Sequence, residues 1–194
     1  MTLLVFHALL WAAVMAALLA SAWTDLKDRI IPNELVGLIA VSGLGISLAL
    51  RPGQAWIGLV AAIVVLFGLG VLSHFNLMGG GDVKLISATT LMVPPEQIGH
   101  LLIAITIAGG FVSCVYLAAR YALTRDRPEN MPAPADMTGD PSREPGGASE
   151  WFSTECARIA AGGPLPYGLA ILGGVAGYIA RELPQCISAT SCSL

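Results

Sequence analysis

Residues 55–85, AWIGLVAAIVVLFGLGVLSHFNLMGGGDVKL, contain the two features that decide how this chain folds. The first is an apolar run that can cross a bilayer as a helix, because about 20 apolar residues span the hydrocarbon core. The second is a run of three glycines, Gly79, Gly80 and Gly81, followed at once by Asp82, where another apolar run begins. An ionisable side chain at the edge of a membrane segment is unfavourable in free energy, so it marks a candidate functional site.

The composition of the whole chain is that of a membrane protein. Of its 194 residues, 55% are hydrophobic and only 12% are charged, and the mean hydropathy is +0.73. A soluble domain carries about 25% charged residues. We therefore expect residues 1–194 to form one polytopic membrane domain. The chain has no basic cluster interleaved with aromatic residues, which argues against nucleic-acid binding.

The fold class expected is all-α, a membrane helix bundle with a site at the membrane boundary. Six transmembrane helices are predicted, at about 3–23, 34–50, 55–73, 83–93, 97–119 and 165–181. The first is expected to be a span and not a cleaved signal peptide, because no Lys or Arg precedes it and it is longer than an ordinary signal-peptide core. Residues 124–150 are rich in proline, glycine and charge, and are predicted to be a disordered loop.

The distribution of Lys and Arg predicts the orientation. With six spans, one side of the membrane receives most of the basic residues: Lys27, Arg29, Lys84, Arg120, Arg125, Arg127, Arg143 and Arg158. The other side receives Arg51 and Arg181. The positive-inside rule places the first set in the cytoplasm, so both termini are expected outside it and the 124–150 loop inside it.

Two aspartates then fall on the cytoplasmic side, Asp25 at the end of the first predicted helix and Asp82 at the start of the fourth. Two carboxylates close together share a proton, and such a pair can activate a water against a peptide carbonyl. Residues 79–81 would let an extended substrate lie against the backbone. The alternative is that Asp82 only caps a helix and that Asp25 is a solvated loop charge. Asn33 is expected to cap the second helix.

The four cysteines do not form a CxxC pair, which argues against a zinc site. Cys186 and Cys192 lie near the C-terminus and could form a disulfide if that tail is outside the cytoplasm, or remain two thiols. The sequence leaves both readings open.

Three stretches together resemble the type IV prepilin peptidases. Asp25, separated by five residues from Ile31-Pro32-Asn33, is similar to one family motif, and GGGDVKL at 79–85 is similar to the second, of the GxGD kind. Residues 165–170, LPYGLA, resemble the start of the family's last helix. The resemblance implies a membrane aspartic endopeptidase that removes the short basic leader of pilin precursors at the cytoplasmic face of the inner membrane. It implies that Asp25 and Asp82 are the catalytic pair and that no cofactor or metal is needed.

The resemblance also bears on which member of the family this is. Bifunctional members that N-methylate their product carry a cytoplasmic domain with two CxxC pairs, and this chain has neither, which argues against methyltransferase activity. Its size resembles the short peptidases of tight-adherence (Flp) pilus systems. The expected partners are a pilin precursor and the lipid bilayer. Two other functions stay open: a GxGD protease for other transmembrane substrates, and a non-enzymatic transporter or scaffold.

Overall fold

The computed structural model describes residues 2–75, 78–125, 156, 159 and 165–191, with side chains from residue 9 onward and up to Arg181. Two compact units divide the chain: residues 1–109 together with 166–194 form one, and residues 110–165 form the other. The first unit holds everything that the site needs. In the second unit, residues 110–125 continue α5 (Ile98–Arg125), and the other described residues there are 156, 159 and 165.

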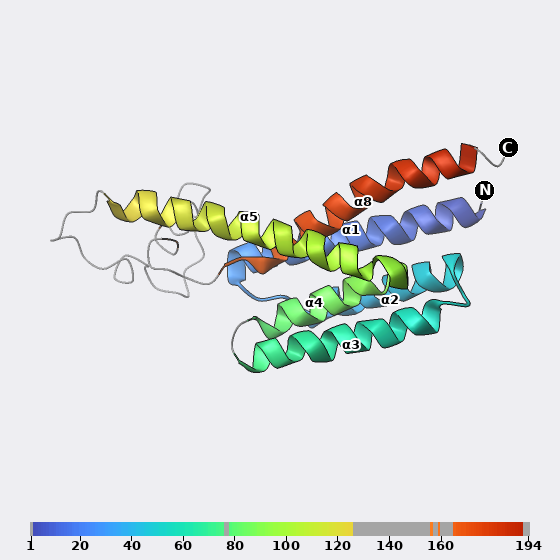
Figure 1. Ribbon diagram of the computed structural model, residues 1–194, viewed down its shortest axis with the longest axis horizontal. Helices are drawn as coiled ribbons and strands as arrows, with labels where there is room; N and C mark the ends of the chain where they lie inside the picture. The colour runs from blue at the N-terminus through green and yellow to red at the C-terminus, as the bar shows by residue number, and fades with distance from the viewer. Residues whose placement is uncertain (1, 76–77, 126–155, 157–158, 160–164, 192–194) are drawn as a thin grey trace. The chain divides into compact units, whose positions relative to one another are not determined.

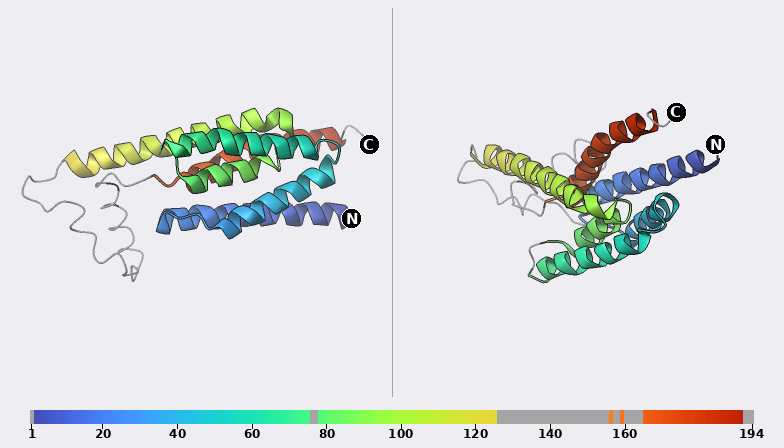
Figure 2. Two further views of the ribbon diagram at one scale, coloured as in Figure 1. Left: turned by 90° about the horizontal axis from the view of Figure 1, so that it is seen from below. Right: turned by 45° about the vertical axis from the view of Figure 1, so that its right-hand side comes forward.

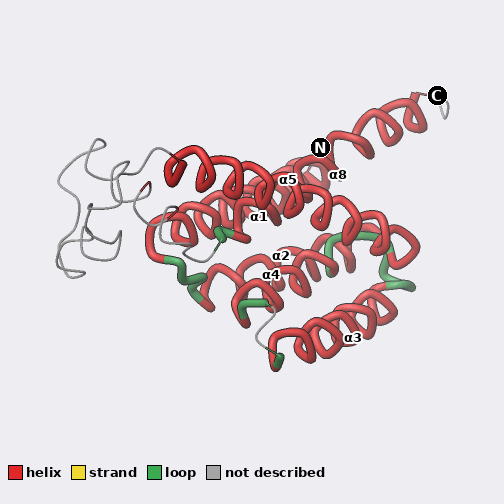
Figure 3. The backbone as a smooth tube through the Cα atoms, turned by 60° about the vertical axis from the view of Figure 1, so that its left-hand side comes forward, coloured by secondary structure: helices red, strands yellow, loops and turns green. Residues whose placement is uncertain are grey.

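The described residues form helices and connecting loops, without a strand (Figure 3). The elements are α1 (Thr2–Asp28), α2 (Asn33–Leu50), α3 (Ala55–His74), α4 (Gly80–Thr90), the short 3-10 helix η1 (Pro95–Gln97), α5 (Ile98–Arg125) and α8 (Tyr167–Ser191). In the first unit, α1 packs against both α2 and α8, although α8 follows it by more than a hundred residues (Figures 1 and 2). The all-α prediction is confirmed.

All six predicted helices are present, but two begin or end differently in a way that matters for the site. α1 continues to Asp28, so Asp25 lies inside the helix and not at its end. Arg29 follows with a left-handed φ of 57°, a conformation that ends helices. α4 begins at Gly80, so two of the three glycines belong to its first turn instead of to a loop. The predicted cap at Asn33 is wrong: Pro32 is the N-cap residue, and Asn33 is the first helical residue.

Four helical segments are long and apolar enough to span a bilayer: Leu9–Asp28, Asn33–Leu50, Ala55–His74 and Pro95–Arg125. This assessment covers only residues with described side chains, which for α8 end at Arg181. α4 has 11 residues, and a helix of that length rises about 16 Å, roughly half the hydrocarbon thickness. The chain is a multi-pass membrane protein in which α4 is too short to span the bilayer.

α4 is the most enclosed helix of the first unit. It packs against α2, α3 and α8, and all residues from Asp82 to Thr90 except Lys84 are buried. Its buried hydroxyl groups donate hydrogen bonds to backbone carbonyls of the same helix. Ser87 Oγ donates to the Val83 carbonyl at 2.7 Å, and Thr90 Oγ1 donates to the Ser87 carbonyl at 2.7 Å. A short helix with polar side chains is thereby held inside an apolar bundle.

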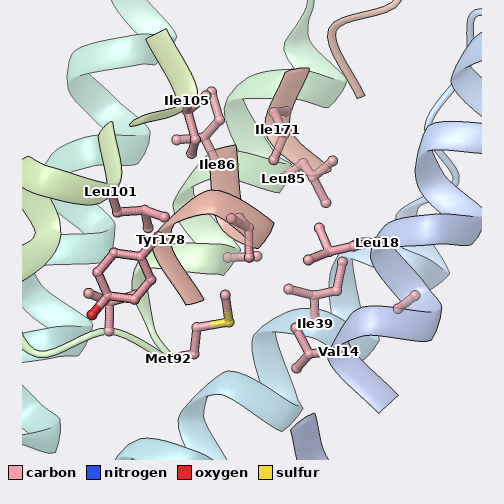
Figure 4. Packing of buried hydrophobic residues seen from close by; sticks show 14 of the residues in the cluster. Val14, Leu18, Ile39, Leu85, Ile86, Met92, Leu101, Ile105, Ile171 and Tyr178 are labelled. Atoms are coloured by element: carbon pink, nitrogen blue, oxygen red, sulfur yellow. The ribbon is translucent and has the colours of Figure 1, made fainter. Parts of the chain in front are cut away.

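The core joins side chains from five helices. Figure 4 shows Leu85, Ile86 and Met92 of the α4 segment facing α1, α2, α5 and α8. Close helix contact here depends on a glycine, because a Cβ at Gly174 of α8 would lie 2.5 Å from the Cα of Ile105. Such a distance leaves no room for any other residue.

Two sequence predictions fall where the structure gives no description. The predicted disordered loop lies outside the described residues from 126 onward, and its first two residues, Thr124 and Arg125, belong to α5. The side chains of Cys186 and Cys192 are also outside the described set, so their pairing stays open.

Candidate active site

Asp25 is buried on α1 and is held by the last helix. Only 6% of its surface is exposed. The backbone N–H of Gly168, in the first turn of α8, donates a hydrogen bond to Asp25 Oδ2 at 2.7 Å. Backbone N–H groups at a helix start have no partner within the helix and favour a negative charge. The Asp25 carboxylate therefore accepts a hydrogen bond from an N–H that has no partner within α8, and this bond fixes its position.

Asp82 is buried on α4, with 8% of its surface exposed. It is the third residue of the helix, and Gly79 is the N-cap residue. A carboxylate at this position can reach back to the N-cap backbone N–H, as in a capping box. Burial and, to a smaller extent, the negative charge of Asp25 raise the pKa of Asp82 to about 7. A hydrogen bond from the Gly79 backbone acts in the opposite direction and lowers this pKa.

The two aspartates thus belong to one electrostatic unit. They come from α1 and α4, and α8 packs against both of these helices. The negative charge of Asp25 contributes to the raised pKa of Asp82, so the two acids interact electrostatically. At neutral pH such a pair can carry one shared proton. This arrangement offers one proton donor and one proton acceptor side by side.

The three glycines before Asp82 differ in the space that the structure leaves for a side chain. A Cβ at Gly79 would lie 2.7 Å from Asp82 Oδ2, and a Cβ at Gly81 would lie 3.3 Å from the Cβ of Ile31. A Cβ at Gly80 would meet nothing closer than Ser73 Oγ at 3.7 Å, which is an ordinary contact. The backbone angles of Gly79, φ −67° and ψ 137°, suit any residue. A side chain at 79 would thus displace the Asp82 carboxylate, and one at 81 would need Ile31 to shift by a few tenths of an ångström.

The stretch Ile31-Pro32-Asn33 contacts the first turns of α4. Ile31 packs against Gly81, and Lys84 Nζ donates a hydrogen bond to Asn33 Oδ1 at 3.2 Å. These contacts fix the loop between α1 and α2 against the start of α4. The Ile31-Pro32-Asn33 stretch therefore serves to place α4 relative to α1, which sequence reasoning did not predict.

A cavity of about 530 Å³ opens beside the start of α4. Gly80, Val83 and Lys84 line it from α4, and α3 lines the other side with Leu66, Phe67, Gly70, Val71, Ser73, His74 and the following Phe75. Gly80 is the only one of the three glycines on this lining. Within the described residues no group of three or more His, Cys, Asp or Glu side chains is placed to hold a metal ion.

The sequence named both aspartates but missed Gly168 as part of their environment. The signal was a glycine at the start of the last helix, directly after Pro164 and Pro166. It became informative only when α8 was seen to lie against α1. The role of Gly79, Gly80 and Gly81 in substrate binding stays a prediction.

The sequence model of the type IV leader peptidase family matches residues 12–115, more than half of the chain. The chain belongs to the type IV leader peptidase family. The matched range contains both aspartates and the helices α2, α3 and α4 that surround them.

Among curated proteins, this family member is similar to the prepilin peptidase EppA of Methanothermobacter thermautotrophicus, with 39% identity over 92 residues. The alignment covers 42% of this chain and 23% of the relative, so it spans about a quarter of that protein's length. No solved structure matches the chain.

Proposed function

We propose that this leader peptidase family member is a membrane-embedded aspartic endopeptidase that removes the basic leader from type IV prepilins. The observation that carries the proposal is the buried pair Asp25 and Asp82, in which one acid holds a proton near pH 7 because of burial and the other acid's charge. The family and the similarity to a prepilin peptidase supply the substrate class. Within this class we propose an Flp-type pilin as the substrate.

The two acids take different parts in hydrolysis. Asp25, whose Oδ2 accepts the Gly168 amide, is the ionised member and removes a proton from the attacking water. Asp82 is the protonated member and gives its proton to the carbonyl oxygen of the scissile peptide, which forms a gem-diol. Collapse of this intermediate breaks the C–N bond. The leaving amine takes the proton from Asp25, and Asp82 recovers its own from the diol.

The cavity between α3 and α4 is where we place the substrate. Its apolar lining suits the hydrophobic segment of a pilin precursor. Neither aspartate lines the cavity, but Gly80 and Val83, which do, lie two residues before and one residue after Asp82 on α4. The excess of Lys and Arg on one side supports our proposal that this end of the bundle faces the cytoplasm. We propose the inner membrane as its location, where a basic leader would be available.

The test is cleavage of a co-expressed pilin precursor by Asp25→Asn and Asp82→Asn variants. Each is expected to abolish cleavage while the protein remains inserted and folded. Asp28→Asn, which removes an exposed carboxylate one turn along the same helix, is the matched control and is expected to retain activity. Cleavage by either of the first two variants would refute the paired mechanism. An unrelated transmembrane substrate in the same assay separates prepilin processing from general intramembrane proteolysis.

A further inference from the structure

A second cavity, of about 570 Å³, lies between α1, α2, α8 and the connection from α4 to α5. It is lined by Trp11, Ala12, Met15, Leu50, Arg51, Met92, Pro94, Gln97, Tyr178 and Ile179. Trp11 and Asp25 are on the same helix, and 14 residues of helix separate them by about 21 Å. The cavity is therefore distinct from the aspartate pair and sits toward the other end of the bundle.

Arg51 is the charged group of this cavity. It directly follows α2, and its Nη2 donates a hydrogen bond to the Met92 carbonyl at 3.1 Å. Its Nε is buried and finds no acceptor among the described residues. A buried donor of a guanidinium without an acceptor is unfavourable, and an anionic ligand oxygen would remove that penalty.

Glu96 lies near Arg51, because the backbone N–H of Gln54, whose side chain reaches Glu96, donates a hydrogen bond to the Arg51 carbonyl at 3.0 Å. Burial lowers the pKa of Arg51, while Tyr178 and Glu96 raise it, so the Glu96 charge acts on Arg51. Glu96 is exposed, and its Oε1 accepts a hydrogen bond from Gln54 Nε2 at 3.4 Å. Arg51 lines the cavity, and Glu96 directly precedes Gln97, which also lines it, so one positive group lies in the lining and one negative group lies next to it. The remaining walls are almost entirely apolar.

We propose that this cavity binds a zwitterionic phospholipid that carries a primary ammonium, a phosphatidylethanolamine. The phosphate accepts from Arg51, the ammonium lies at Glu96, and an acyl chain occupies the apolar wall of Trp11, Met15 and Ile179. The charge pattern selects this headgroup, because a net anionic lipid would meet Glu96 without a cation to pair with it. The volume lies within the range of ligand sites, about 300–1,000 Å³.

The experiment measures lipid retained by purified full-length protein. The delipidated protein in detergent is titrated with dioleoyl phosphatidylethanolamine or dioleoyl phosphatidylglycerol, and bound lipid is counted by native mass spectrometry. We expect the wild type to retain the ethanolamine lipid preferentially. Arg51→Gln is expected to weaken retention of both lipids by about tenfold, since it removes a charge-assisted hydrogen bond. Arg125→Gln, which removes an exposed charge at the end of α5, is expected to change nothing.

Glu96→Gln separates headgroup selection from simple binding, and is expected to abolish the preference for ethanolamine over glycerol while retention itself persists. Ala12→Phe, which fills the cavity without changing its charge, is expected to reduce retention of both lipids and serves if Arg51→Gln does not fold. Equal retention by the wild type, Arg51→Gln and Ala12→Phe would overturn the site. A preference for ethanolamine that survives Glu96→Gln would overturn the assigned headgroup.

Discussion

Gly168 and Asp25 are joined by a 2.7 Å hydrogen bond from the backbone of one to the side chain of the other, although 143 positions separate them in the chain. The contact is tight on all sides, since a Cβ at Gly168 would lie 3.0 Å from the Asp25 Cβ and 3.1 Å from its Oδ2. The last helix therefore sets the position of an acid that belongs to the first.

Gly168→Ala is expected to impair cleavage more than folding. The added methyl must move either the Asp25 carboxylate or the start of α8, and displacements of about 1 Å in a catalytic group can cost 10²-fold in rate. We expect a fall of about that size in kcat for a pilin precursor, with thermal unfolding changed little. Gly173→Ala is the control on the same helix, because its Cβ would meet only Ala108 Cβ at 3.7 Å. Equal rates for both variants would contradict a positioning role.

Gly79→Ala is expected to change kcat, and Gly80→Ala is expected to change KM. A methyl at 79 displaces the Asp82 carboxylate, which lies 2.7 Å from the site of the new Cβ, so kcat should fall by about 10²-fold. A methyl at 80 has room and projects toward the substrate cavity, so KM should rise a few-fold while kcat is kept. Steady-state cleavage of a pilin precursor measures both. A Gly80→Ala variant that loses kcat as severely as Gly79→Ala would reverse this assignment.

Asp82 predicts a pH dependence of stability. Its pKa rises from an ordinary value of 3.8 to about 7 in the folded protein, so between these values the folded state binds a proton that the unfolded state has released. The stability from this acid is complete below about pH 4 and is lost as the pH rises to about 7, by up to about 1.4 kcal/mol per pH unit. Asp82→Asn removes this loss.

The measurement is the difference in unfolding free energy between Asp82→Asn and the wild type, in detergent, from pH 4 to pH 9. The difference should grow in favour of the variant up to about pH 7 and then stay constant. Asp28→Asn serves as the control for loss of one carboxylate. A difference that is flat across the whole range would show that Asp82 is not buried beside another negative charge.

Gly174→Ala is expected to destabilise the bundle without acting on the aspartates directly. The new Cβ would lie 2.5 Å from the Cα of Ile105, and overpacking of this kind costs about 1–3 kcal/mol or more. Gly177 on the same helix has nothing within 4 Å of its Cβ position, so Gly177→Ala should stabilise by about 0.5–1 kcal/mol through helix propensity. Unfolding by sodium dodecyl sulfate compares the two. Equal stabilities would mean that α5 and α8 do not pack as closely as described.

The sequence was sufficient to predict the helices, because apolar runs are local signals. It also drew attention to the two acids, which the structure buries, while their catalytic role stays a prediction. Apolar runs predicted six helices, and the charge in MGGGDVKL predicted Asp82 as a site residue. The ends of helices were less predictable. The charges of Thr24–Glu34 suggested a loop, yet α1 continues to Asp28 and places Asp25 within a packed helix.

Contacts between distant segments could not be predicted. The fit of Gly81 to Ile31, the bond between Lys84 and Asn33, and the amide of Gly168 at Asp25 all depend on how three helices pack. A single sequence contains each residue but not its neighbour. It likewise could not separate Gly80, where a Cβ makes only an ordinary contact, from Gly79 and Gly81, where a Cβ would displace Asp82 or press on Ile31.

The link between Gly168 and Asp25 also has a consequence for the order of biosynthesis. Asp25 leaves the ribosome early and Asp82 follows it, but Gly168 is made 143 residues after Asp25. Until then the first acid lacks the backbone donor that fixes it. The arrangement of the two acids therefore depends on a segment that is synthesised after both of them.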